Sequence, residues 1–268
     1  MDKKMRKTDS GSGEHFCQEL QSFALEGVDK LGIASARLFD GAPSGARPTD
    51  LMPECKSVIV FAVKHLDVLA TTRNLACQAY SQDITNRETS HQAYRISRFI
   101  EKHEFLAFPM VASVSMWPFV EDEEAVAGRI SLRHAAQLAG LGRIGRNAML
   151  LTPEFGPRVQ LGAILTDAEL PASPALQQNP CNACDLCIKH CPANALQAPV
   201  PPAEYSPVDK DRCMAFRREH GGRSPLGYSD SCGLCRAVCP IGKRTRGRSS
   251  IEKTEKNCGE KGTPPGRE

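Results

Sequence analysis

Eight cysteines in the last third of the chain constrain its fold more than any other feature. Seven of them form a C-x2-C-x2-C-x3-C-P run at residues 181–192 and a shorter C-x2-C-x3-C-P run at residues 232–240, and the eighth, Cys213, lies between the runs. Three thiolates spaced in this way lie on a tight loop that can wrap three corners of a [4Fe–4S] cluster, and in two-cluster ferredoxins the fourth Cys of the run ligates the other cluster. The second run lacks one thiol, and Cys213 is the available replacement. The spacing therefore predicts two [4Fe–4S] clusters with crossed ligands.

Crossed ligation predicts which thiols share a cluster. Cluster 1 would take Cys181, Cys184, Cys187 and Cys239, and cluster 2 would take Cys191, Cys213, Cys232 and Cys235. Zinc is the alternative, because C-x2-C pairs also build zinc ribbons. Zinc gives no reason for a triple run or for a proline after the last Cys of both runs, so we favour iron–sulfur. The other cysteines lack such spacing and are expected to be packing or tail residues: Cys17, Cys55, Cys77 and Cys258.

The bulk properties predict a globular protein of a reducing compartment. The chain has 268 residues, 41% of them hydrophobic, and a net charge of +3, which is too small to argue for nucleic-acid binding by itself. Residues 1–15 are polar and charged with no apolar segment behind them, and no later run reaches the length of a membrane span. Twelve cysteines without an export signal favour metal ligation over disulfides. We expect a cytoplasmic protein without membrane contact.

The order of patterns along the chain predicts an α+β protein with two folded parts. A break rich in Pro and polar residues at 169–180 separates them. We expect a disordered lead-in at 1–13, a mixed α/β domain at 14–172, a ferredoxin-like domain at 173–243 and a disordered basic tail at 244–268. Periodicity predicts helices over 16–31 (stopped by Gly32), up to His103 and over 132–139, and strands at 57–63, 110–115 and 159–166.

A glycine-rich segment follows the last of these helices. Gly140, Gly142 and Gly145 match G-x-G-x-x-G, and Asp167 lies downstream as in a dinucleotide-binding fingerprint. That fingerprint needs a strand before its first glycine, whereas residues 132–139 have helical spacing. We therefore do not expect a Rossmann site. The glycines indicate either a backbone that something approaches closely or a turn that ends the helix.

Three further features have more than one explanation. His134 could be a ligand, but a lone His in a helix is more often partly buried there. Trp117 could belong to a core or to a pocket wall, and the acidic stretch 121–124 is most simply a solvated loop.

The segment from His134 to Leu170, followed by CNACDLCIKHCP and CGLCRAVCP, resembles the epoxyqueuosine reductase family and the related reductive dehalogenases. The resemblance implies an N-terminal α/β domain, related in fold to flavin nitroreductases, that binds base-off cobalamin and receives electrons from the ferredoxin-like domain. It implies that the corrinoid pocket includes Gly140, Gly142, Gly145, Asn147, Gly156 and Arg158.

The chain departs from that family in several places. The segment of the family's catalytic acid, Tyr…Asp-Tyr-His, corresponds here to residues 80–91, which contain only Tyr80 and Asp83. These two are the candidates for the acid, and a surface turn is the simpler explanation of Asp83. The chain ends before the helical-repeat extension of many family members and lacks the leader of respiratory dehalogenases. We therefore expect a short cytoplasmic relative with an unknown substrate.

The same resemblance suggests partners. We expect a reductase fed by an electron donor such as a ferredoxin or flavodoxin. The alternative is a non-enzymatic electron carrier. Contact with tRNA is a third hypothesis, motivated also by the basic residues Lys243, Arg244, Arg246 and Arg248, for which a solubilising tail is the simpler explanation.

Overall fold

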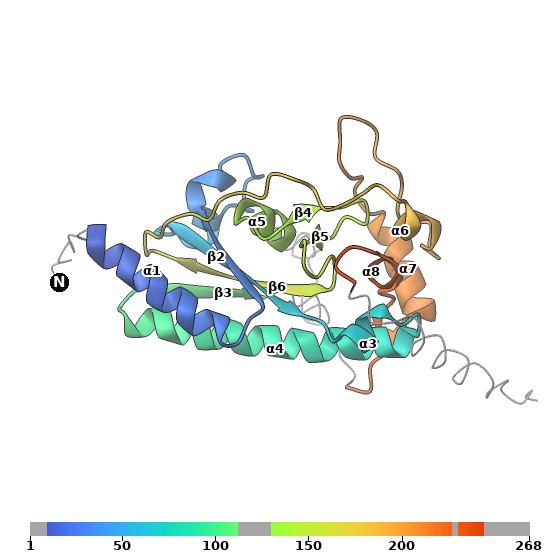
Figure 1. The fold of residues 1–268 in the computed structure, drawn as a ribbon, viewed down its shortest axis with the longest axis horizontal. Helices are drawn as coiled ribbons and strands as arrows, with labels where there is room; N and C mark the ends of the chain where they lie inside the picture. The colour runs from blue at the N-terminus through green and yellow to red at the C-terminus, as the bar shows by residue number, and fades with distance from the viewer. Residues whose placement is uncertain (1–9, 112–129, 227–229, 244–268) are drawn as a thin grey trace, which may run out of the picture.

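A four-stranded antiparallel sheet forms the centre of the molecule (Figure 1). The computed structural model describes residues 10–111, 130–226 and 230–243. The strand order is β1-β2-β6-β3, and every neighbouring pair is antiparallel. The strands are β1 (Lys30–Ser35), β2 (Ser57–Lys64), β3 (Ala107–Val111) and β6 (Val159–Thr166).

Both faces of the sheet are buried, which explains why β2 is a continuous apolar run. Val58 and Val60 face one hydrophobic cluster, and Ile59 and Phe61 face the other. Alternate residues of a strand point to opposite faces, so a strand covered on both sides needs apolar residues at every position. Gly162 of β6 leaves room for the Phe61 ring, which a Cβ would overlap.

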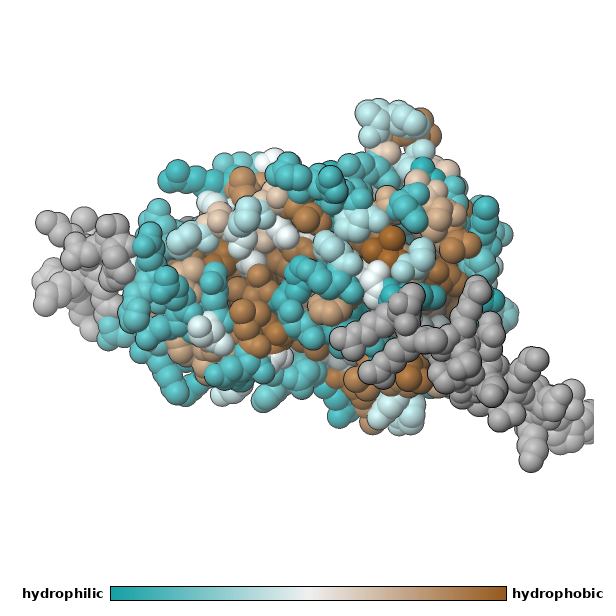
Figure 2. All heavy atoms as spheres, in the orientation of Figure 1, coloured by the Kyte–Doolittle hydropathy of each residue, from teal (hydrophilic) through white to brown (hydrophobic). Residues whose placement is uncertain are grey.

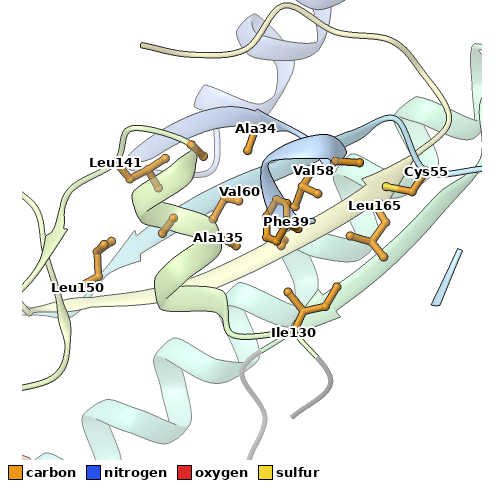
Figure 3. Close-up of a cluster of buried hydrophobic side chains, with 14 of the residues drawn as sticks. Ala34, Phe39, Cys55, Val58, Val60, Ile130, Ala135, Leu141, Leu150 and Leu165 are labelled. Carbon is orange, nitrogen blue, oxygen red and sulfur yellow. The ribbon is translucent and has the colours of Figure 1, made fainter. Parts of the chain in front are cut away.

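Helices cover the two faces unequally. On one face lie α1 (Ser10–Leu25) and the long α4 (Leu75–Lys102), whose residues join the cluster around Phe61. On the other face, α5 (Leu132–Leu138) packs its alanines against Val58 and Val60 (Figure 3). Shorter elements connect these: η1 (Ala36–Phe39), α2 (Pro48–Leu51), α3 (Asp67–Thr71), β4 (Arg143–Ile144) and β5 (Leu150–Leu151).

The cysteine-bearing part of the chain lies at one end of the sandwich, on the right in Figure 1. It contains α6 (Leu186–Lys189), α7 (Lys210–His220), α8 (Leu234–Ala237) and the short pair β7 (Gly222–Arg223) and β8 (Asp230–Ser231). The β7–β8 pair contacts α4, and α8 contacts α3. On the face drawn in Figure 2, hydrophilic residues are interspersed with smaller apolar areas.

Most of the predicted elements are confirmed, and one helix was wrong. The strands at 57–63 and 159–166 and the helices over 132–139 and up to His103 match β2, β6, α5 and α4. The first helix ends at Leu25, not Leu31, because Leu31 and Gly32 belong to β1. Leu31 fits the helical period, but it packs from a strand against the same cluster. The helix also begins at Ser10, inside the predicted lead-in.

Some expectations fall outside the described ranges or are met only in part. The strand predicted at 110–115 coincides with β3 only as far as Val111. Trp117, the acidic stretch 121–124, Cys258 and the tail 244–268 lie outside the residues that the structure describes. Within the described ranges, no helix combines the length and apolarity that crossing a lipid bilayer requires.

Candidate metal centre

The first cysteine run folds as a loop that leads into a single helical turn. Asp185 adopts a left-handed conformation (φ 57°) just before α6, and Ala183 does the same (φ 57°). The loop is attached at its start, where the Cys181 amide donates to Asn179 Oδ1 at 3.0 Å. Left-handed backbone at non-glycine residues is uncommon and costs free energy, so the surrounding contacts must hold this loop in shape.

The second run repeats this local fold. Residues 184–191 and 232–239 share the spacing C-x2-C-x3-C. Gly233 occupies the position of Asp185, is left-handed as well (φ 61°), and precedes α8 as Asp185 precedes α6. The two short helices contact each other. The two runs are therefore a structural repeat brought together in space.

The thiols of the first predicted set lie close enough to influence one another. Burial, with smaller contributions from the thiols of Cys181, Cys239 and Cys184, raises the pKa of Cys187 to about 11. Burial also raises the pKa of Cys239, to which Cys181 and Cys184 contribute while Arg158 opposes. Cys239 comes from the second run, so this neighbourhood crosses between the runs.

The second predicted set behaves in the same way. Burial raises the pKa of Cys235 to about 12, with contributions from Cys232, Cys213 and Cys191. Burial raises the pKa of Cys232, and Cys213 and Cys191 add to it. Cys213 is supplied by α7 and Cys191 by the first run. A bound metal would reverse this direction, because a coordinating thiol is deprotonated.

Each set of four thiols matches the ligand chemistry of an iron–sulfur cluster, for which four thiolates are the usual set. In the described part of the chain, no group of three or more Cys, His, Asp or Glu side chains is arranged to hold a single metal ion. Zinc would need four ligands about 2.0–2.3 Å from one centre. The described thiols therefore form two neighbouring groups, and their ligation of iron–sulfur clusters stays a prediction.

Two buried arginines attach the second run to the N-terminal sheet and helices. Arg158, which follows Gly156 and Pro157 at the start of β6, is 1% exposed. Its Nη1 donates to the Cys239 carbonyl at 3.0 Å and its Nη2 to the Ile241 carbonyl. Burial lowers the pKa of Arg158, while Cys239 and Asp67 oppose the shift.

Arg236, between Cys235 and Cys239, is 2% exposed and points the opposite way, into α4 and the end of β2. Its Nη1 donates to His65 Nε2 at 2.8 Å and to Gln82 Oε1 at 3.0 Å, and its Nη2 donates to Gln78 Oε1 at 2.7 Å. Burial lowers the pKa of Arg236 to about 10, opposed by Cys235, so the guanidinium stays protonated at neutral pH.

His65 accepts this hydrogen bond, which fixes its protonation state. It is fully buried, and its Nδ1 lies 3.0 Å from Ser81 Oγ and 3.1 Å from Thr85 Oγ1. Burial and the Arg236 charge hold the pKa of His65 well below its usual value. Because Nε2 accepts from a guanidinium, the proton of the neutral ring is on Nδ1.

The glycine segment serves packing in the described structure. Gly140 (φ 76°) ends α5 with the hydrogen-bond pattern of a Schellman motif, from Leu141 N to Ala136 O at 2.9 Å and from Gly140 N to Gln137 O at 3.1 Å. The absence of a preceding strand confirms that this is not a dinucleotide fingerprint, and the helix-ending turn is confirmed at Gly140. A Cβ at Gly142 or Gly145 would overlap Leu151.

The remaining residues that the resemblance assigned to a corrinoid also contact protein. A Cβ on Gly156 would overlap the Ile241 carbonyl, Arg158 bonds the second cysteine run, and Asn147 Oδ1 accepts from Met149 N at 3.1 Å. These described contacts do not by themselves form a corrinoid site. The corrinoid role of the six residues stays a prediction, and we derive no step through a corrinoid from them.

The same segment is joined to the first cysteine run by a polar bridge. Asn179 Nδ2 donates to the Ile144 carbonyl at 3.2 Å and to Glu204 Oε2 at 2.9 Å. Arg143 reaches Glu204 Oε1 at 2.8 Å. Arg146 pairs with Asp185 at the start of α6. The glycine segment therefore positions the loop that carries Cys181, Cys184 and Cys187, three of the thiols predicted for cluster 1.

The catalytic-acid candidates lie on α4. Asp83 is 2% exposed, so its explanation as a surface turn is wrong. It lies on the buried face of α4. Tyr80 lies about one helical turn earlier and is 37% exposed. His134 is a partly buried helix residue, as expected, and its Nε2 lies 2.9 Å from Tyr205 Oη. Cys17 and Cys55 are buried among core residues, which confirms their packing role.

Sequence reasoning missed the buried network of Arg236, His65 and Gln78. One signal was available. When the two cysteine runs are aligned, Arg236 occupies the position equivalent to Ile188, so a charged residue stands where the first run has an apolar one. Nothing in the pattern around His65 indicated its partner, because the two residues are 171 positions apart.

Comparison with known proteins confirms the resemblance seen in the motifs. No protein-family model matches the chain. An epoxyqueuosine reductase of Bacillus cereus is 27% identical over 259 residues, covering 81% of this chain and 62% of the relative. The chain therefore spans less than two thirds of the length of such relatives.

Solved structures share the fold. The crystal structure of an epoxyqueuosine reductase with an epoxyqueuosine-modified tRNA-Tyr stem loop aligns with a TM-score of 0.55 and 23% identity, covering 84% of this chain and 64% of that one. A reductive dehalogenase, whose structure suggests a mechanism for B12-dependent dehalogenation, aligns with a TM-score of 0.66 and 18% identity, covering 90% and 34%. The mixed α/β fold is thus that of these two groups.

Proposed function

We propose that this chain is an iron–sulfur oxidoreductase of the epoxyqueuosine reductase-like type. The main support is that the eight thiols form two groups within which the thiols influence one another's pKa. Each group contains cysteines from both runs. Curated relatives named as reductases support an enzyme. Cluster 1 is proposed to bind Cys181, Cys184, Cys187 and Cys239, and cluster 2 to bind Cys191, Cys213, Cys232 and Cys235.

The clusters, when bound, supply one-electron transfer. The chain supplies position and charge. Arg158 and Arg236 hold the second run against the N-terminal domain, and Asn179 holds the start of the first run. Burial of Cys239 would keep water away from one side of cluster 1, and solvent exposure is one of the factors that sets a cluster potential.

We propose cobalamin, bound base-off, as the acceptor of these electrons. The support is the motif resemblance and the fold shared with a structure described as B12-dependent. Asp83 and Tyr80 are the candidates for the proton donor, because they occupy the segment that corresponds to the family's acid. Asp83 is buried on α4, next in sequence to Gln82, which binds Arg236. A buried position supports this role more than an exposed turn would.

The substrate and partners are proposed more generally. A relative's structure contains a modified tRNA stem loop, which supports a test of tRNA binding for this chain. A small electron donor such as a ferredoxin or flavodoxin would supply electrons in the cytoplasm. The competing function, a non-enzymatic electron carrier, would need the clusters and no corrinoid.

Joint analysis of iron and cobalt tests the proposal. Protein purified without oxygen and reconstituted should hold about eight irons per chain, and its visible spectrum should change on addition of cob(II)alamin. Eight irons with an unresponsive spectrum would support the carrier function. Stoichiometric zinc with little iron after reconstitution would reject the iron–sulfur assignment.

A further inference from the structure

Arg236 is a buried cation whose hydrogen-bond partners are all neutral. They are the side chains of His65, Gln78 and Gln82, and Arg236 Nε is buried without a hydrogen-bond partner among the described residues. Transferring a charge from water into a protein interior is unfavourable unless an opposite charge compensates it. The three neutral acceptors bind its two terminal nitrogens but leave its charge uncompensated.

The charged groups near the Arg236 guanidinium indicate which group compensates its charge. In the described ranges, Arg236 forms no ion pair with a carboxylate. Two groups act on its charge: Arg158 repels it, and Cys235, the residue directly before it, attracts it when its sulfur is a thiolate, as it is in a metal ligand. His65 cannot compensate it, because its Nε2 accepts the guanidinium proton and the ring is neutral.

We propose that Arg236 is the counter-charge of cluster 2 and raises the reduction potential of that cluster. This inference rests on the proposed function, since it requires a cluster at Cys235. A [4Fe–4S] cluster on four thiolates carries net negative charge, and reduction adds one electron from an external one-electron donor without making or breaking a bond. A fixed cation in a low-dielectric surrounding stabilises the more negative, reduced state.

The repeat provides an internal contrast. Ile188, which holds the corresponding position in the first run, is apolar and half-buried, so α6 has no buried charge there. The cations that act on the cluster 1 thiols, Arg146 and Arg158, come from outside the two cysteine runs. Arg236 adjoins Cys235 directly, and its effect should therefore fall mainly on cluster 2. It acts as a positioning and tuning residue, not as a group that touches substrate.

The test is a potentiometric titration of reconstituted protein, followed by electron paramagnetic resonance and with iron content measured in parallel. Arg236→Gln removes the charge, Arg236→Lys keeps it, and Arg212→Gln removes an exposed arginine beside Cys213 as the matched control. We expect Arg236→Gln to lower the equilibrium constant for reduction of one cluster at least tenfold. This corresponds to a fall of about 59 mV in its reduction potential for one electron. Arg236→Lys and Arg212→Gln should shift it by less than half of that.

Every outcome bears on the inference. Unchanged potentials in Arg236→Gln with both clusters present would overturn it, as would equal shifts of both clusters. If Arg236→Gln loses a cluster while Arg236→Lys keeps both at wild-type potentials, the charge is required and the inference stands. If Arg236→Lys loses the same cluster, the requirement is for guanidinium geometry and the inference fails. A wild-type protein that binds no iron would instead reject the proposed function.

Discussion

The two cysteine runs share one local fold but are held by different means. The first is fixed at a half-exposed surface by Asn179 and by the pair of Arg146 with Asp185. The second is held by two buried guanidiniums: that of Arg158, beside β6, bonds carbonyls of the run, and that of Arg236 reaches from the run to His65 and α4. Exposed ion pairs contribute little to stability, whereas a buried charge with satisfied hydrogen bonds is costly to disturb. The comparison shows that the second run is attached to the N-terminal sheet and helices through buried contacts. The first run is attached through contacts at the surface.

The largest expected effect tests whether the runs exchange ligands. Cys191→Ala and Cys187→Ala lie four residues apart in the same run, yet they should remove different clusters. We expect iron to fall from about eight to about four in each. Cys187→Ala should abolish the same resonance signal as Cys239→Ala, and Cys191→Ala the same signal as Cys235→Ala. If both first-run variants lost the same signal, the crossed arrangement would be refuted.

The next effect tests the buried attachment of the second run. Arg158→Met leaves the carbonyls of Cys239 and Ile241 without their donor in a buried site. Each buried acceptor left unsatisfied costs about 1–3 kcal/mol, so we expect a loss of about 3 kcal/mol in the free energy of unfolding. Guanidinium chloride denaturation, at matched cofactor loading, measures it. A loss below about 1 kcal/mol would show that the second run is not held in this way.

A smaller effect compares the equivalent turn positions. Gly233→Ala places a Cβ in a left-handed residue and against the Gln78 amide that binds Arg236, and should cost about 1–2 kcal/mol. Asp185→Gly should relieve a left-handed non-glycine residue while losing the contact with Arg146, and should change stability by less than about 1 kcal/mol. Thermal unfolding of both variants makes the comparison. Equal destabilisation by the two would contradict it.

The smallest effect concerns the exposed attachment of the first run. Arg146→Gln removes an ion pair whose partners are both partly exposed, so it should destabilise the protein less than Arg158→Met does. The loss should shrink further at high salt because mobile ions screen exposed charges. Unfolding in low and high salt measures this, with Arg158→Met as the salt-insensitive reference. If Arg146→Gln lowered the free energy of unfolding as much as Arg158→Met does, the two runs would not differ in how they are attached.

The local pattern predicted those parts of the fold in which burial alone selects the residue type. The runs Ser57–Lys64 and Val159–Thr166 are apolar on both faces, and both were correctly read as strands. The edge strand β1 was mistaken for the end of a helix, because Leu31 satisfies both periods. The burial of Asp83 was also missed, because it belongs to a mostly polar helix, α4, whose buried face is set by tertiary packing and not by a local pattern.

The candidate site was predictable to a different extent. The ligand roles and the crossed grouping of the eight thiols were read from their spacing and stay a prediction, which the proximity of the thiols supports. The charges around them could not be read from spacing, since His65 and Arg236 meet only after 171 residues of chain have folded. The glycine segment was read through its family resemblance, and the structure assigns its glycines contacts with Leu151, Pro174 and Ile241 that no pattern indicated.

The interleaved neighbourhoods of the thiols also bear on how the protein is made. The first set needs Cys239 and the second needs Cys232 and Cys235, so neither set is complete when the ribosome has finished only the first run. In the proposed arrangement, a nascent chain that has passed Cys191 holds four thiols of the first run and no complete set of ligands. Neither proposed cluster could then be completed before the second run has left the ribosome.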